Sequence, residues 1–175
     1  MLTWAAALPT ITSQIVNMLY NLVDRIYIGH MPPADTVGKL ALTGVGVCLP
    51  VIMIVSAFAA LIAMGGAPRA SIQEGRGNVR ESERIMGNCF SLLVMLSLVL
   101  TVVFRLFVPM LLPFFGASEN TIGYAVSYLN IYSLGTIFVQ ITLGMNAYIT
   151  AQGFTTISMK TVLIGAILNT ILDPI

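Results

Sequence analysis

Polar side chains that could bind a cation follow one face of a helix predicted near the start of the chain. At about 100° per residue, this face carries Thr10, Ser13, Gln14, Asn17, Tyr20, Asn21 and Asp24. Residues 1–23 contain no charged side chain, so Asp24 follows a long uncharged stretch. A carboxylate inside a membrane helix costs about 2.5–3.5 kcal/mol on insertion scales and by default marks an ion or substrate pathway. The stripe therefore predicts a helix with lipid or protein on most sides and a water-lined cavity on one.

A second carboxylate, Asp173, lies at the end of the last predicted helix, four residues after Asn169 and on the same helix face. At 1.5 Å per residue, Asp24 lies roughly 28 Å and Asp173 roughly 22 Å along its helix, so we expect both in the outer half of the membrane. Burial and a second nearby carboxylate both favour the protonated form of a carboxyl group. The pair therefore suits binding of Na⁺ or a proton. The alternative is that each Asp is an interfacial residue at a helix end.

Composition and charge distribution predict the fold class. Charged residues make up 9% of the 175 residues and hydrophobic residues 57%, far from the roughly 25% charge of soluble domains. The charges cluster, which leaves uncharged stretches long enough to cross a bilayer, for which about 20 apolar residues suffice. We expect an all-α polytopic membrane protein with five transmembrane helices, near 5–29, 40–66, 86–112, 122–149 and 157–175.

The distribution of arginines predicts the orientation. The segment Arg69–Arg84 contains four arginines against three glutamates, and short loops rich in Lys and Arg face the cytoplasm. We therefore expect the N-terminus and the loops 67–85 and 150–157 on the cytoplasmic side. The loops 30–39 and 113–121 are then expected outside.

Several other classes of protein fit the sequence poorly. The net charge is +1 and no basic run suggests nucleic-acid binding. The chain has a single histidine, His30, and two cysteines, Cys48 and Cys89, which are predicted at depths too different for a disulfide or a metal cluster. We expect no enzymatic activity and no resident cofactor or metal, apart from a coupling Na⁺ or H⁺ at the two aspartates. Three polar residues of the fourth helix are expected to act as interhelical hydrogen-bond partners: Thr136, Gln140 and Asn146.

Short motifs run along the chain in a characteristic order: Ala7-Leu8-Pro9, Tyr20–Asp24, Ile28–His30, Ala41–Pro50, Ser71 with Gly75–Gly77, Gly116–Ser118, Asn146–Gly153 and Leu168–Pro174. In residue type and spacing they resemble the multidrug and toxic compound extrusion (MATE) transporters, in particular a bacterial branch of that family. The resemblance covers essentially the whole chain. One departure is Thr150, where many relatives carry a basic residue in the turn between the fourth and fifth helices.

The resemblance implies a fold of two six-helix lobes around a central cleft. It also implies export of organic cations across the bacterial cytoplasmic membrane, driven by inward movement of Na⁺ or H⁺. The chain would then be an N-terminal lobe with five of its six helices, lacking the second lobe. The complete transporter would be a monomer in the lipid bilayer.

The resemblance also assigns roles to individual residues. The first-helix acid of the family corresponds to Asp24, and its fifth-helix Asn and Asp correspond to Asn169 and Asp173, which would bind the coupling cation. The cavity and substrate site would be lined by Asn17, Tyr20, Asn21 and Asn146.

Two alternatives to an exporter stay open from sequence. A lipid-linked oligosaccharide flippase of the same superfamily should show a basic cavity for a pyrophosphate, whereas the intramembrane charges here are acidic. In a non-transporting membrane assembly module, the polar stripe would only hold helices together, a task for which Ser, Thr and Asn suffice.

The orientation gives a first testable prediction. Single cysteines placed at Asp35 and Asn78 should differ in labelling when an impermeant thiol reagent is added outside intact cells. Asp35→Cys should react and Asn78→Cys should not, because four arginines near two span ends outweigh the single Lys39 across the membrane. Labelling at position 78 but not at position 35 would overturn the topology.

Overall fold

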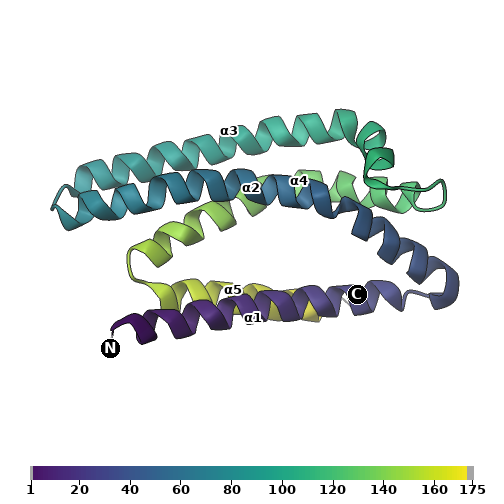
Figure 1. Cartoon of the computed structure of the whole chain (residues 1–175), viewed down its shortest axis with the longest axis horizontal. Coiled ribbons are helices and arrows are strands. Elements are labelled where there is room, and N and C mark those ends of the chain that lie inside the picture. The colour runs from purple at the N-terminus through teal and green to yellow at the C-terminus, as the bar shows by residue number, and fades with distance from the viewer. Residues whose placement is uncertain (1, 173–175) are drawn as a thin grey trace. The chain divides into compact units, whose positions relative to one another are not determined.

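The computed structural model describes the backbone of residues 2–172, and the side chains of these residues other than 2–6 and 34–35. Within this range the chain forms five long α helices: α1 (Leu2–Gly29), α2 (Lys39–Gly75), α3 (Val79–Leu111), α4 (Ile122–Ala151) and α5 (Thr155–Leu172). Two short elements adjoin them: a π-helical turn, η1 (Ala34–Gly38), and a 3₁₀ turn, η2 (Leu112–Phe115). The described residues contain no strand, and the predicted all-α fold is confirmed (Figure 1).

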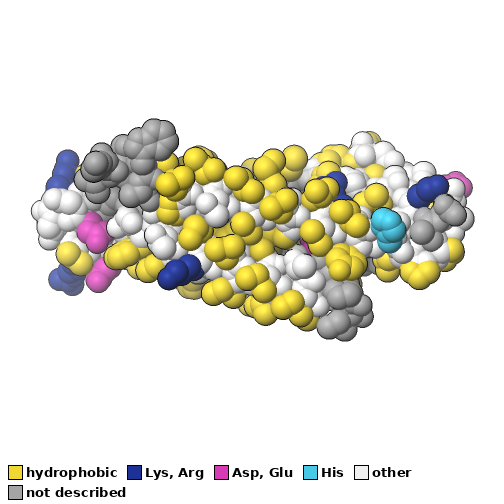
Figure 2. Space-filling view, turned by 90° about the horizontal axis from the view of Figure 1, so that it is seen from below, with side chains coloured by type: hydrophobic (Ala, Val, Ile, Leu, Met, Phe, Trp, Pro, Cys, Tyr) yellow, Lys and Arg dark blue, Asp and Glu magenta, His cyan; other side chains and the backbone are white. Residues whose placement is uncertain are grey.

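The long helices are built for an apolar surrounding. Within the described residues, four segments are long and apolar enough to cross a membrane, with mean hydropathies between 1.3 and 2.7: Thr36–Gly75, Val79–Phe115, Ile122–Ala151 and Thr155–Leu172. Helix α1, although 28 residues long, is not among them, because its polar stripe lowers its mean hydropathy. Apolar side chains also make up most of the face seen in Figure 2.

The chain divides into two compact units. One consists of Thr43–Tyr148 and contains nearly all of α2, α3 and α4; the other consists of the described residues before and after this range, and its main contact is between α1 and α5. Within the second unit, α1 and α5 run side by side in the same direction (Figure 1).

The core of the α2–α4 unit is apolar at one end and contains polar side chains further along. Buried residues at helical spacing form its main cluster: Cys48, Val51 and Val55 of α2, Leu100, Phe104 and Val108 of α3, Leu112 of η2, and Ala125 and Leu129 of α4. Gln140, which is fully buried, donates from Nε2 to the backbone oxygen of Val55 across the helices at 2.9 Å. The interhelical role predicted for Gln140 is thereby confirmed.

Two glycines let the helices of this unit approach closely. A Cβ atom at Gly144 would overlap the fully buried side chain of Leu93, and one at Gly66 would overlap the Tyr148 hydroxyl and lie 2.5 Å from Cys89 Sγ. Small residues at such crossings are how membrane helices gain close van der Waals contact when lipid supplies no hydrophobic driving force.

Helix α2 continues further than the span expected near residues 40–66. It passes through Pro68 and ends at Gly75, because a membrane helix tolerates a proline where neighbouring helices support the freed backbone groups. Here Ala67 and Ala70 are buried against Tyr148 of α4. A tight turn then reverses the chain at Gly77, whose φ of 79° is a conformation that favours glycine.

Candidate cation-binding site

The least exposed side of α1 carries polar side chains, with the half-buried Val16 and Val23 beside them. Ser13 is buried, and Asn17, Tyr20 and Asp24 are half-buried, whereas the apolar side chains on the opposite side of the helix are 52–55% exposed: Ile11, Ile15, Leu19 and Ile26. We call the side chains of Ser13, Asn17, Tyr20 and Asp24 the polar seam of α1. A water-soluble helix would bury its apolar side instead, so this arrangement fits a helix in an apolar surrounding.

Two side-chain oxygen atoms of the α1–α5 pair are shielded from solvent. They are Oδ1 of Asp24 on α1 and Oδ1 of Asn169 on α5, both belonging to half-buried residues. The buried residues of α5 share a side with Asn169 at helical spacing: Thr155, Ser158 and Ala166. Carboxylate and amide oxygens are hard ligands, which bind hard cations or a proton rather than soft metals.

Part of the polar stripe lies outside the seam. Gln14 and Asn21 are exposed, and Asn21 donates from Nδ2 to the backbone oxygen of Asn17 at 2.7 Å. Asn17 and Asn21, with the exposed Arg25, line a shallow hollow of about 340 Å³ that Met18 and Leu22 complete. The stripe therefore has two halves. The buried half includes Asp24, and the open half includes the exposed Asn21, which lies near Arg25.

The predicted site residues are distributed over both units. Asp24, Asn17, Tyr20, Asn21 and Asn169 all lie on α1 or α5, and their positions there are those described above. Asn146 is on α4 in the other unit, half-buried, with its Oδ1 shielded. Asp173 lies outside the described residues, so its pairing with Asp24 stays a prediction. Among residues 2–172, no cluster of three or more His, Cys, Asp or Glu side chains could hold a metal.

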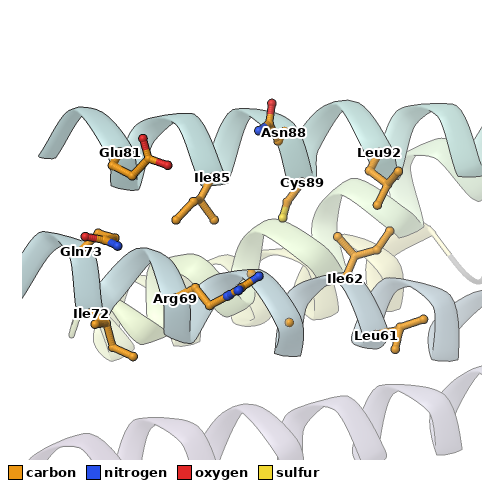
Figure 3. A pocket seen from close by; sticks show the side chains of 12 residues that line it. Leu61, Ile62, Arg69, Ile72, Gln73, Glu81, Ile85, Asn88, Cys89 and Leu92 are labelled. Carbon is orange, nitrogen blue, oxygen red and sulfur yellow. The ribbon is translucent and has the colours of Figure 1, made fainter. Parts of the chain in front are cut away.

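A groove in the α2–α4 unit was not predicted from the sequence. It lies between α2 and α3 and is lined by residues from Leu61 to Leu92, including Arg69, Glu81 and Cys89 (Figure 3). The signal that could have revealed it is the end of an uncharged run at Arg69 on α2 and the start of another after Arg84 on α3.

The chain is similar to a known protein family. The family model described as MatE matches residues 9–175 of the chain. Among curated proteins, the Multidrug export protein MepA of Staphylococcus haemolyticus (strain JCSC1435) is 26% identical over 169 residues, which cover 97% of this chain and 36% of that protein. The Multidrug export protein MepA of Staphylococcus aureus (strain MRSA252) is 25% identical over 171 residues, with the same two shares.

Solved structures share the arrangement of the helices. One, described as a crystal structure of MATE in the bent conformation, superposes with a TM-score of 0.83 at 23% identity and covers 95% of this chain and 36% of its own. Another, described as protein A, superposes with a TM-score of 0.90 at 30% identity and covers 98% of this chain and 37% of its own. The chain thus spans little more than a third of the length of the relatives it matches.

The division of the α1 stripe can be tested by thiol accessibility in membranes. Asn21→Cys and Leu19→Cys place thiols two residues apart on exposed positions, one on the open polar half and one on the apolar side. We expect a charged maleimide to react at least roughly tenfold faster at position 21, because a thiolate forms only where water solvates it.

The background for this comparison is Cys89→Ala, which leaves only the fully buried Cys48. Equal rates at positions 19 and 21 would mean that both sides of α1 have the same surroundings, and the division would be wrong.

Proposed function

The chain belongs to the MatE family, and from this premise we propose that it acts within a secondary exporter of organic cations. Its membrane-length helices and its relatives make it a multi-pass membrane protein. The relatives it matches are named multidrug export proteins, which supports drug efflux as the activity of the complete transporter. We further propose that the chain supplies most of the N-terminal lobe, that a second lobe completes the cleft, and that the Arg69–Arg84 loop faces the cytoplasm.

The observation that carries the proposal is the position of Asp24. A carboxylate with a shielded oxygen lies on the least exposed side of a helix whose opposite side is apolar. A side chain that only anchored the helix at the membrane surface would have no need for a shielded oxygen. Ionisable groups inside membrane segments are costly, and they are kept where they serve an ion path or a proton relay.

The proposed mechanism couples cation binding at this seam to movement of the lobe. Asp24 and Asn169, with Asp173 as a further predicted ligand, would hold Na⁺ or a proton, and Asn146 would help to orient it. Tyr20, Asn17 and Asn21 would line the adjoining cavity for the organic cation. Charge on Asp24 would differ between the cation-loaded and empty states, and only such a differential interaction lets a ligand shift the balance between two conformations.

A two-lobe arrangement is what such coupling requires. Alternating access in secondary transporters is largely the rocking of one repeat or bundle against another around a fixed site near the midplane. A cation that binds between α1 and α5 would bias the packing of this pair, and thereby the conformation of the lobe. The same site could not drive transport without a second lobe to move against.

Efflux by site variants tests this proposal. In the complete transporter, Asp24→Asn keeps the size of the side chain and most of its hydrogen bonding but removes the charge that would hold the cation. We expect active efflux of ethidium, with a cation gradient imposed, to be lost in Asp24→Asn and Asp173→Asn at matched expression. Membrane insertion should persist, because a costly intramembrane charge is gone.

The matched control is Glu119→Gln, which removes an exposed carboxylate in the segment between η2 and α4. This variant should transport normally. Near-normal efflux by both aspartate variants would reduce Asp24 and Asp173 to interfacial residues, and the coupling role would have to be abandoned.

A further inference from the structure

The groove between α2 and α3 changes character along its length (Figure 3). Its volume is about 720 Å³, within the range of pockets that bind small molecules. Leu61, Ile62 and Leu92 form one end, whereas Arg69 and Glu81 lie toward the end where the chain turns from α2 into α3. The groove is thus apolar at one end and charged at the other.

The change coincides with the edge of the uncharged runs. On α2 the run 40–68 ends at Arg69, and on α3 the run 85–104 begins directly after Arg84. The two helices run in opposite directions and are joined by a tight turn, so both edges lie at the same end of the pair (Figure 1). In a membrane, a groove with such walls extends from the acyl-chain region to the level of the headgroups.

Arg69 is the charged side chain closest to the apolar end. It extends along the groove toward Ile62 (Figure 3), and it pairs with no carboxylate among the side chains that the structure describes. A guanidinium offers five donors in a planar fork that matches phosphate. At this level of a membrane, the abundant phosphate is that of a phospholipid headgroup.

Glu81 lies on the opposite wall, nearer the turn (Figure 3). Its side chain is half exposed, and it forms a long ion pair of 3.9 Å with Arg84 on its own helix, whose side chain is more exposed still. Exposed ion pairs of this kind contribute little to stability. The Glu81 carboxylate can therefore accept hydrogen bonds from another group. Gln73, on the facing helix α2, lines the same end of the groove (Figure 3).

We propose that this groove binds an aminophospholipid of the adjoining leaflet, of the phosphatidylethanolamine class. From the apolar end outward, the groove presents aliphatic side chains, then the cation Arg69, then the anion Glu81. A phosphatidylethanolamine presents acyl chain, phosphate and ammonium in the same order. Charge-assisted hydrogen bonds at both charges are about twice as strong as neutral ones.

Other occupants match this order less well. A phosphatidylglycerol headgroup ends in neutral hydroxyls, so it would make a weaker contact with Glu81. A phosphatidylcholine headgroup carries no N–H donor at all. A protein segment could also cover the groove, and the experiment below distinguishes it from lipid. The inference concerns lipid binding and does not depend on the transport activity proposed above.

The alkylation rate of the chain's own cysteines reports whether a lipid occupies the groove. Cys89 is half-buried in the wall of the groove, whereas Cys48 is fully buried in the core and serves as the internal control. The chain would be reconstituted in bilayers of phosphatidylcholine alone, or of phosphatidylcholine with phosphatidylethanolamine or with phosphatidylglycerol. We expect phosphatidylethanolamine to slow alkylation of Cys89 by about tenfold, the effect of about 1.4 kcal/mol of binding, and phosphatidylglycerol to slow it much less.

Paired variants assign the two contacts. Arg69→Gln should abolish protection, and Glu81→Gln should remove the preference for phosphatidylethanolamine over phosphatidylglycerol. The controls Arg76→Gln and Glu83→Gln remove like charges that do not line the groove, and they should leave protection unchanged. In every variant an unreactive Cys48 reports that the helices remain packed.

Three results would overturn the proposal. Equal protection by the two added lipids would remove the role of Glu81, and equal loss in Arg69→Gln and Arg76→Gln would reduce the effect to general surface charge. Alkylation of Cys89 that is as slow in phosphatidylcholine alone as with phosphatidylethanolamine added would show that the groove is covered without an aminophospholipid.

Discussion

The structure depends on one constraint: polar groups within an apolar surrounding must lie against protein or water. Helix α1, which packs on α5, meets it by shielding Ser13, Asn17 and Asp24 while Ile11, Ile15 and Leu19 are exposed. Leaving a polar group in hydrocarbon without partners costs several kcal/mol, so the position of the polar residues decides which side of α1 must be covered. The candidate cation site is a consequence of this packing, because Asp24 in the polar seam of α1 and Asn169 on α5 both have shielded side-chain oxygens.

The α2–α4 unit follows the same constraint with different means. Its helices gain contact through small residues, such as Gly66 beneath Tyr148 and Gly144 beneath Leu93, and Gln140 bonds to a backbone oxygen of the neighbouring helix. A membrane helix pair obtains little from the hydrophobic effect, and close van der Waals packing with a few hydrogen bonds replaces it. The result is a packed three-helix unit whose outer surface stays apolar.

The sequence predicts the fold well and the site in part. Uncharged runs of membrane length predict where the five helices lie, because charged side chains are costly in the bilayer core. Periodicity also identifies the polar stripe, but it cannot show which neighbour covers which half, so the division between the seam and the open positions Gln14 and Asn21 needed the structure. The groove at Arg69 and Glu81 was missed because it arises only when the turn at Gly77 folds the start of α3 back along the end of α2.

The central claim is that Asp24 links the coupling cation to the organic cation. Linkage is reciprocal, so a cation that weakens drug binding must itself be displaced by the drug. The most direct measurement is the affinity of the purified complete transporter for ethidium, followed by fluorescence as Na⁺ concentration and pH are varied. In the wild type, affinity should change with one of these cations, by roughly 5–150-fold for a coupling of about 1–3 kcal/mol, and Asp24→Asn should abolish the dependence. An undiminished cation dependence in Asp24→Asn would contradict the account.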